Sequence, residues 1–242
     1  MTIELKSDLD VRMIQKMGGD HMVVAAAKVS ILGEEAMSYA KPELADSNYG
    51  LINYLMGFRH GTPFEHAAVT FFVRAPIFVW REWHRHRIGF SYNEESGRYK
   101  QLEPVFYIPD RERPMMKVDG WKPGRPRFLR CEDDDVYAKL VANLTESYKL
   151  AYRSYEDNLA LGIDPGLARD CLPVGIYSSC WVTCNPRSLM AYLSLRTHDL
   201  DAKYVSYPLH EIELAAKACE KIFEEGWPLT YKAFLANGRV GP

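Results

Sequence analysis

The densest concentration of chemically active side chains lies in residues 81–99, which read REWHRHRIGFSYNEESGRY. This segment holds four arginines, two histidines and three glutamates beside several aromatic residues. Arginine presents N–H donors in a fixed plane, which suits recognition of a phosphate or of the imide edge of a base. These residue types therefore predict a binding site for an anionic ligand such as a nucleotide.

A helix is expected to carry the first half of this segment. Proline is tolerated in the first turn of a helix, so Pro76 predicts a helix that continues through His86 and ends near Gly89. On such a helix Glu82, Arg85 and His86 would share one face, because they lie three and four residues apart.

A loop is expected to carry the second half. The small side chains and flexible backbone of Ser91, Asn93, Ser96 and Gly97 predict a loop that cradles an anion. Arg98 would supply the counter-charge.

Three other interpretations of the same residues are less favourable. A charged helical face is usually solvated surface, but the excess of arginine and the interleaved aromatic residues argue against that here. A metal site on His84 and His86 is disfavoured, because residues two apart on a helix point about 200° away from each other. Ser96 is a poor candidate for a covalent nucleophile, because an activated serine needs an oriented base and the nearby arginines favour phosphate binding instead.

These residues resemble the signature of the flavin-dependent thymidylate synthases. The hallmark of that family is Arg-His-Arg, seven residues, then Ser, commonly followed by x-Arg-Tyr. Here residues 85–87 are followed by Ser96, Arg98 and Tyr99, with eight intervening residues. The additional residue lies at 89–90, so the local turn is expected to differ from the family pattern.

Further blocks of the chain resemble the same family in the same order. Residues 60–66 are similar to its histidine-containing turn before a strand, and residues 168–169 with 172–173 to its second arginine on the nucleotide side. Residues 185–189 and 195–196 are similar to its C-terminal block. The resemblance predicts no role for residues 198–208, where this chain is longer than the family pattern.

The resemblance implies an α+β fold, a homotetramer with active sites shared between subunits, and conversion of dUMP to dTMP. It also implies FAD as cofactor, with NADPH and methylenetetrahydrofolate as co-substrates. The implied FAD contacts are Thr62, Arg85, His86, Arg87, Glu94, Asn185 and Arg187, with His60 in a supporting role toward flavin and folate. The implied dUMP contacts are Glu82, Arg85, Glu94, Ser96, Gly97, Arg98, Arg169 and Arg196.

Arg196 is the candidate for activating the uracil ring. Asn185 and Pro186 predict the start of a helix, on which Arg196 would follow Leu189 and Leu193 along an apolar stripe. A guanidinium that bonds the N3/O2 edge of uracil would favour the ring's anionic form. The alternative is a structural salt bridge at the end of a helix, where the helix dipole favours a cation.

The five cysteines are not expected to supply a nucleophile. They form no CxxC pair, which argues against a zinc ribbon or a disulfide framework and favours a reducing compartment. Cys180 and Cys184 lie in an apolar run and are interpreted as core residues. Hydride from reduced flavin, rather than an enzyme thiolate, would then drive the reaction.

The elements that must position these residues predict a helix-rich, single α+β domain over residues 1–242, with a small, mostly antiparallel sheet. Strands are expected at 2–6, 66–74 and 176–183. Helices are expected at 23–31, 47–58, 77–87, 135–161, 186–196 and 209–225. The first of these helices should be buried, the second should bury Leu51, Tyr54, Leu55 and Phe58, and Trp80, Trp83 and Tyr99 should be core residues. Residues 102–131 are expected to be extended and exposed.

Composition excludes several classes of protein. A net charge of −2 gives no overall attraction to nucleic acid or to an anionic membrane. The sequence also has no apolar run long enough to predict a membrane span. The start of the chain lacks the pattern of a signal peptide, so a cytoplasmic location is expected.

Two rival functions remain open at this point. A single-strand nucleic-acid-binding module could use the arginine and aromatic residues of 81–99. A metal-dependent nucleotide hydrolase could use Glu82 with one of the histidines. Neither rival would bind flavin, so the colour of the purified protein separates them from the flavoenzyme.

Overall fold

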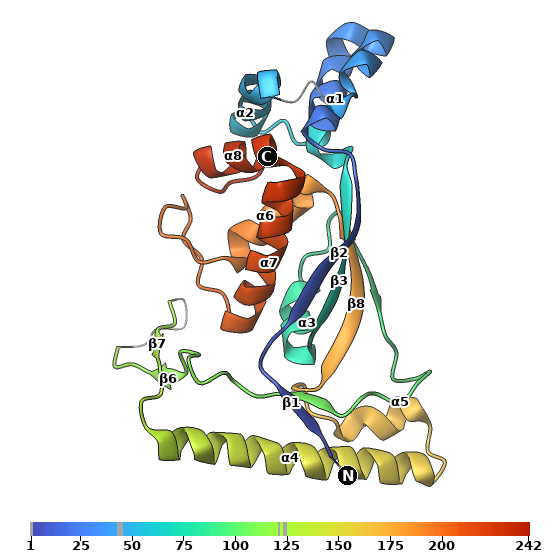
Figure 1. Cartoon of the computed structure of the whole chain (residues 1–242), viewed down its shortest axis with the longest axis vertical. Helices are drawn as coiled ribbons and strands as arrows, with labels where there is room; N and C mark the ends of the chain where they lie inside the picture. Colours follow the sequence, from blue (N-terminus) through green and yellow to red (C-terminus); the bar gives the residue numbers. More distant parts are fainter. Residues whose placement is uncertain (1, 43–45, 121, 123–124) are drawn as a thin grey trace. The chain divides into compact units, whose positions relative to one another are not determined.

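The computed structural model describes residues 2–42, 46–120, 122 and 125–242 (Figure 1). The chain forms two compact units, each of which is described by itself. The first unit comprises Met1–Asp10, Arg74–Trp83 and Glu94–Cys180, and the second comprises Val11–Val73, His84–Asn93 and Trp181–Pro242.

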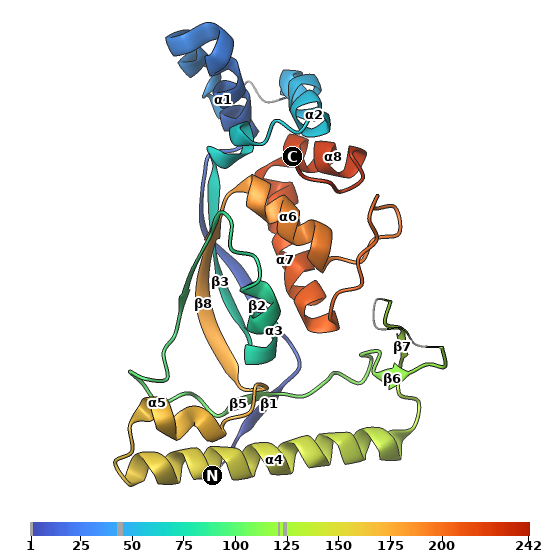
Figure 2. The ribbon, with the colours of Figure 1, turned by 180° about the vertical axis from the view of Figure 1, so that it is seen from behind.

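Helices dominate both units, and the strands are short, so the predicted α+β class is confirmed (Figures 1 and 2). The helices are α1 (Asp20–Leu32), α2 (Tyr49–Gly57), α3 (Ile77–Trp83), α4 (Asp134–Ala160), α5 (Pro165–Ala168), α6 (Pro186–Arg196), α7 (His210–Gly226) and α8 (Pro228–Ala236). The strands are β1 (Glu4–Lys6), β2 (Asp10–Met17), β3 (Ala68–Pro76), β4 (Phe90–Glu94), β5 (Val105–Tyr107), β6 (Met116–Lys117), β7 (Phe128–Leu129) and β8 (Tyr177–Cys184). Short 3₁₀ helices occupy Gly33–Tyr39, Asp46–Asn48, Thr62–Glu65 and Arg169–Cys171.

The largest sheet has the strand order β2-β3-β8-β4. Within the second unit it comprises residues 11–17, 68–73, 181–184 and 90–93. In the first unit β1 pairs in parallel with β5, and β6 pairs antiparallel with β7. Among the described residues, no helix is both long enough and apolar enough to cross a membrane.

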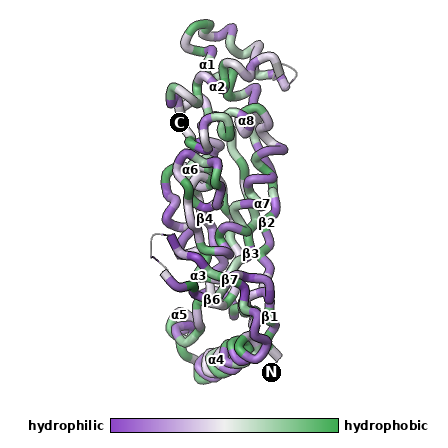
Figure 3. Tube along the Cα trace, turned by 90° about the vertical axis from the view of Figure 1, so that its left-hand side faces the viewer, coloured by the Kyte–Doolittle hydropathy of each residue, from purple (hydrophilic) through white to green (hydrophobic). Residues whose placement is uncertain are grey.

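Helix α4 organises the core of the first unit. The Asp133 side chain caps its first turn by accepting hydrogen bonds from the amides of Asp135 and Val136. Hydrophilic and hydrophobic residues mix along the helix, as Figure 3 shows. Its tyrosines at 148, 152 and 155 are buried together with Phe106, and the helix predicted at 135–161 is confirmed.

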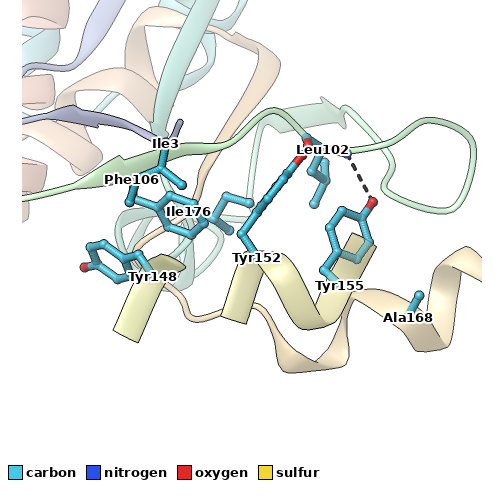
Figure 4. Close-up of a cluster of buried hydrophobic side chains, with 8 residues drawn as sticks. All are labelled: Ile3, Leu102, Phe106, Tyr148, Tyr152, Tyr155, Ala168 and Ile176. Atoms are coloured by element: carbon cyan, nitrogen blue, oxygen red, sulfur yellow. Dashed lines mark hydrogen bonds between the residues drawn. The ribbon is translucent and has the colours of Figure 1, made fainter. Parts of the chain in front are cut away.

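The same tyrosines hold the segment that follows the candidate loop. Tyr152 Oη donates to the Leu102 carbonyl at 2.7 Å, and the Leu102 amide donates to Tyr155 Oη at 3.2 Å (Figure 4). Tyr148 Oη donates to the Tyr107 carbonyl at 2.9 Å. Hydroxyl groups on α4 thus satisfy backbone groups that would otherwise be buried without a partner. The prediction that all of 102–131 is exposed is therefore wrong for residues 102 and 105–107, which are buried.

The second unit contains a cap that the sequence did not reveal. The buried Asp20 carboxylate, at the start of α1, accepts hydrogen bonds from the amides of Leu229 and Thr230 and from the Thr230 hydroxyl. These contacts satisfy the first turn of α8, whose first residue is Pro228. The helix predicted at 209–225 is confirmed as α7, but a further helix follows it directly, where the sequence suggested only an end.

Two predicted faces in the second unit differ from the structure. In α1 the residues from Val23 to Ala25 are buried, whereas Ile31 is 86% exposed, so the helix is buried at its first half only. In α2 the buried side chains are Ile52, Leu55 and Met56, because α2 packs against α8 along that face. Tyr54 and Phe58 are exposed, and their rings lie 4.5 Å apart in a tilted arrangement, which corrects the predicted face. Strand β2 was not predicted.

Replacement of Tyr152 by Phe should lower the free energy of unfolding by about 1–3 kcal/mol, because the buried Leu102 carbonyl then loses its donor. Chemical denaturation measures this change. Tyr54→Phe is the matched control, because the Tyr54 side chain is exposed, and it should change stability by less than about 0.5 kcal/mol. Equal stability of the two variants would show that the hydroxyls of α4 do not hold this segment.

Candidate active site

The helix that carries Glu82 ends earlier than the sequence predicted. Helix α3 stops at Trp83, where Trp80 and Trp83 are buried and stacked at 5.3 Å, as core residues should be. Arg85 and His86 therefore lie in the loop that follows, and the expectation of a shared helical face with Glu82 is wrong. The Tyr92 hydroxyl donates to the His86 carbonyl at 2.6 Å. The loop is thus held by β4 rather than by further helical hydrogen bonds.

The predicted anion-cradling loop is shorter than expected. Ser91 and Asn93 belong to β4, so only the turn from Glu95 to Tyr99 remains irregular. The Ser96 hydroxyl accepts from the Arg98 amide at 3.3 Å, and the Ser96 carbonyl accepts from the Tyr99 amide at 3.0 Å. The turn therefore presents Ser96, Gly97 and Arg98 in succession. Tyr99 is 83% exposed, so its assignment to the core is wrong.

The turn lies against a second predicted arginine. Gly97 is buried, and a Cβ atom built on it would lie 3.1 Å from both Arg169 Cδ and Leu102 Cδ1. A Cβ atom on Gly166, near the start of α5, would lie 3.5 Å from Arg98 Cγ. Arg98 thus belongs to the turn and the side chain of Arg169 lies against it, both within the first unit. Two guanidinium groups beside a turn with a small hydroxyl side chain can bind a phosphate.

Glu94, just before the turn, is held by strand β8. Its Oε1 atom accepts a hydrogen bond from the Ser178 hydroxyl at 2.6 Å, and Ser178 is buried. The neighbouring Glu95 accepts from the Ser179 amide at 2.7 Å and pairs with Lys100 at 2.8 Å. These contacts with β8 fix the chain immediately before the turn.

A second group of predicted residues gathers at the start of α6, in the second unit. The predicted cap is confirmed, because Asn185 Oδ1 accepts from the Ser188 amide at 2.8 Å and Pro186 is the first helical residue. The 3₁₀ helix that begins at Thr62 packs against α6. Arg187 Nη1 contacts Glu65 Oε1 at 2.6 Å, and its Nε donates to the Pro242 carbonyl at 2.8 Å. His60, before this 3₁₀ helix, is exposed, and its ring lies 6.0 Å from that of Tyr54.

Two glycines permit close approach around this group. A Cβ atom on Gly61 would lie 2.5 Å from Arg187 Cζ, and one on Gly89 would overlap the Ser188 hydroxyl oxygen. Gly89 also has a φ of 69°, in the region that favours glycine. The sequence showed both glycines as ends of helices and gave no signal for these contacts.

A cavity of about 590 Å³ opens beside the same residues. Its lining includes Glu65, Gly89, Asn185, Arg187 and Ser188. This volume lies in the range of cofactor and small-ligand pockets. The start of α6 contributes the positive end of a helix dipole, which favours an anionic ligand.

Arg196 lies at the end of α6 and is partly buried. Its Nε donates a hydrogen bond to His86 Nε2 at 3.0 Å. Burial and the charge of Arg196, in that order, lower the pKa of His86 to about 4. At neutral pH the imidazole is therefore uncharged and can accept this bond.

The predicted site residues are thus distributed over two units. Glu82, Glu94, Ser96, Gly97, Arg98 and Arg169 belong to the first unit, and His60, Thr62, Arg85, His86, Arg87, Asn185, Arg187 and Arg196 belong to the second. Within the units the structure brings Gly97 to Arg169 and His86 to Arg196. The convergence of all these residues on one nucleotide stays a prediction.

The cysteines behave as the sequence predicted. Cys180 and Cys184 are buried in β8, and burial raises the pKa of the Cys184 thiol. Burial also raises the pKa of Cys219. No group of three metal-binding side chains (His, Cys, Asp or Glu) occurs in the part of the chain that the structure describes.

Comparison with known proteins identifies the family. The family model described as "Thymidylate synthase complementing protein" matches residues 12–229. The chain is 48% identical to the flavin-dependent thymidylate synthase of Streptomyces coelicolor, over 99% of this chain and 96% of that protein. It is 44% identical to the flavin-dependent thymidylate synthase of Tropheryma whipplei, over 98% and 96% of the two chains.

A solved structure agrees with this relationship. The UMP/dUMP methylase PolB from Streptomyces cacaoi, bound with 5-Br dUMP, superposes with a TM-score of 0.89 at 46% identity, over 99% of this chain and 100% of that chain. The same protein bound with 5-Br UMP gives a TM-score of 0.88. The chain belongs to the flavin-dependent thymidylate synthases, a family of enzymes, as its motifs predicted.

The close approach of Gly89 to α6 can be tested by substitution. Gly89→Ala should lower the free energy of unfolding by more than Gly162→Ala, which has a similar φ of 78° but open space around it. The control reports backbone strain of about 1–2 kcal/mol alone, and overlap with Ser188 should add about 1–3 kcal/mol. In a Ser188→Ala background part of this added cost should disappear. Equal effects of both alanines would contradict the contact.

The charge state of His86 gives a second test. Nuclear magnetic resonance of the imidazole should show titration near pH 4, and Arg196→Ala should raise that pKa because both the nearby positive charge and part of the burial are lost. A pKa near the ordinary 6.5 in the unmodified protein would show that the ring is not held as described.

Proposed function

We propose that the chain makes thymidylate by reductive methylation of dUMP, with methylenetetrahydrofolate as the carbon donor, reduced FAD as the hydride source and NADPH as the reductant of the flavin. Family membership supplies the reaction class. The observation that supports the proposal within the structure is the placement of Arg169 against the turn that carries Gly97 and Arg98. The curated relatives are named as flavin-dependent thymidylate synthases.

The phosphate of dUMP would bind at this turn. Ser96 and Gly97 offer a hydroxyl and a close backbone approach, and the two arginines offer forked, charged donors. Glu94, held by Ser178, would accept from hydroxyl or N–H groups of the ligands. Glu82 would accept from the ribose, since a carboxylate beside the phosphate is unfavourable.

Arg196 would contact the uracil ring of dUMP. C5 of uracil is a weak nucleophile until the ring gains electron density. A guanidinium bonded to N3 and O2 stabilises the N3-deprotonated ring, so it strengthens the nucleophile without forming a covalent bond to the enzyme. Burial keeps the thiols of Cys184 and Cys219 neutral, which supports a route without an enzyme thiolate.

The residues around the cavity at the start of α6 fit a flavin dinucleotide. The cavity is lined by the Asn185 side chain and the Arg187 guanidinium beside a helix N-terminus, a combination that would suit a pyrophosphate. Thr62, Arg85, His86 and Arg87 would complete the contacts, with His60 at the folate side. When bound, the flavin supplies hydride to the transferred carbon unit.

The proposal includes a homotetramer with shared active sites, which sedimentation or light scattering can measure. It also favours dUMP over UMP, although the solved relative is named a methylase of both nucleotides. Turnover of dUMP and UMP at equal concentration distinguishes the two substrates.

Arg196→Ala should reduce dTMP formation by about 10²–10³-fold, the usual cost of removing one donor that stabilises a developing anion. Flavin should stay bound, as measured by visible absorbance after FAD is added and excess is removed. Arg196→Lys keeps the charge but loses the fork, so it should also be strongly impaired.

Two controls accompany this test. Arg153→Ala removes an exposed arginine of α4 and should leave turnover unchanged. Cys171→Ala removes the exposed cysteine and should also retain activity. Near-normal turnover of Arg196→Ala would refute the role of that residue, and loss of activity in Cys171→Ala with normal dUMP binding would instead indicate a thiolate mechanism.

A further inference from the structure

We propose that His86 is a positioning residue that orients the guanidinium of Arg196 by accepting a hydrogen bond from its Nε. This inference rests on the proposed role of Arg196 toward uracil and adds a second task for His86 beyond a contact with flavin. It rests on the contacts between the loop after α3, which contains His86, and one turn of α6.

The hydrogen bond itself fixes the chemistry of both partners. Arg196 Nε lies 3.0 Å from His86 Nε2, although the two residues are 110 positions apart in the chain. A guanidinium can donate but cannot accept, so His86 Nε2 must carry a lone pair. In the neutral ring the proton therefore lies on Nδ1, which assigns the tautomer.

The imidazole is held on several sides. Its ring packs edge-on against Tyr192 at 5.0 Å with an interplanar angle of 80°, and it lies 6.1 Å from the ring of Phe90. Tyr192 is fully buried and lies one helical turn before Arg196 on α6. The Tyr92 hydroxyl fixes the backbone of His86 through its carbonyl. His86 thus spans one turn of α6 and contacts the two residues at its ends.

A neutral acceptor suits this position better than a carboxylate. The ring resists protonation because its burial disfavours the charged form and because a second positive charge would face Arg196. The imidazole therefore satisfies Nε without adding a negative charge of its own near a uracil ring that must become anionic. A carboxylate at the same place would oppose that anion.

Fixing Nε also fixes the plane in which the guanidinium presents its Nη1 and Nη2 atoms. A free arginine side chain carries about 2 kcal/mol of rotamer entropy, and forked recognition needs both donors in the plane of the base. Misplacement of a catalytic donor by about 1 Å can cost about 10²-fold in rate. Loss of the His86 acceptor should therefore reduce the chemical step more than nucleotide binding.

Two substitutions separate the hydrogen bond from the packing of the ring. His86→Gln keeps an acceptor near the position of Nε2 but loses the ring, and His86→Phe keeps a ring against Tyr192 but loses the acceptor. Three quantities are measured for each: FAD bound per chain, the rate of flavin reduction by NADPH without dUMP, and kcat and KM for dTMP formation.

The two variants are expected to differ in kcat but not in flavin binding or flavin reduction. The kcat of His86→Phe should be about 10–30-fold lower than that of His86→Gln, with a smaller difference between the two variants in the KM for dUMP. Flavin content and flavin reduction, compared at saturating FAD, should be similar in the two variants. The reverse order, with Phe active and Gln inactive, would overturn the proposal in favour of ring packing. Equal loss in both variants, in step with lost flavin, would leave His86 as a flavin contact only and would also overturn it.

A spectroscopic test does not depend on activity or on the folding of these variants. Nitrogen-15 resonance of His86 in the unmodified protein should show an unprotonated Nε2 at neutral pH, with a shift that changes on Arg196→Lys. A protonated Nε2, or no change, would overturn the proposal even in an active enzyme. If the protein formed no dTMP but showed the expected resonance, the proposed function would fail while the pairing of His86 with Arg196 stood.

Discussion

The proposed function depends on the hydrogen bond made by the partly buried guanidinium of Arg196 at the end of α6. A neutral imidazole accepts the hydrogen bond of Arg196 Nε, and burial keeps that imidazole neutral. Because the acceptor carries no charge, it orients the arginine without itself cancelling the positive charge that the proposed chemistry uses. The loop after α3, strand β4 and helix α6 are all needed to place these two side chains together.

The part of the proposed site that would bind the phosphate depends on helix α4. Three tyrosines of α4 bond to the backbone of residues 102 and 107 and so hold the chain just beyond the turn at Gly97. Leu102 then packs beside Gly97 and Arg169. A long helix far from the family motif therefore holds the chain beside the turn that carries Gly97 and Arg98, which would link the stability of the first unit to the geometry of the proposed binding turn.

Much of this could be predicted from the sequence, because some signals are local. The helix predicted at 135–161 and the Asn185-Pro186 start of α6 depend on periodicity and capping, and the structure confirms both. The end of α3, strand β4 and helix α8 could not be predicted, because contacts outside each element help to decide them. The Tyr92 hydroxyl holds the loop at His86, and Asp20 caps α8 from more than 200 residues away. The closeness of Gly61 and Gly89 to α6 is likewise a tertiary contact with no local signature.

The most direct test of the central claim is the protonation of N3 in bound dUMP. Nitrogen-15 resonance of dUMP labelled at N3 can follow the titration of the ring while the nucleotide is held by the protein. If oriented guanidinium groups stabilise the anionic ring, the N3 pKa of bound dUMP will be clearly lower than that of free dUMP. An N3 pKa equal to or above that of the free nucleotide would contradict the account.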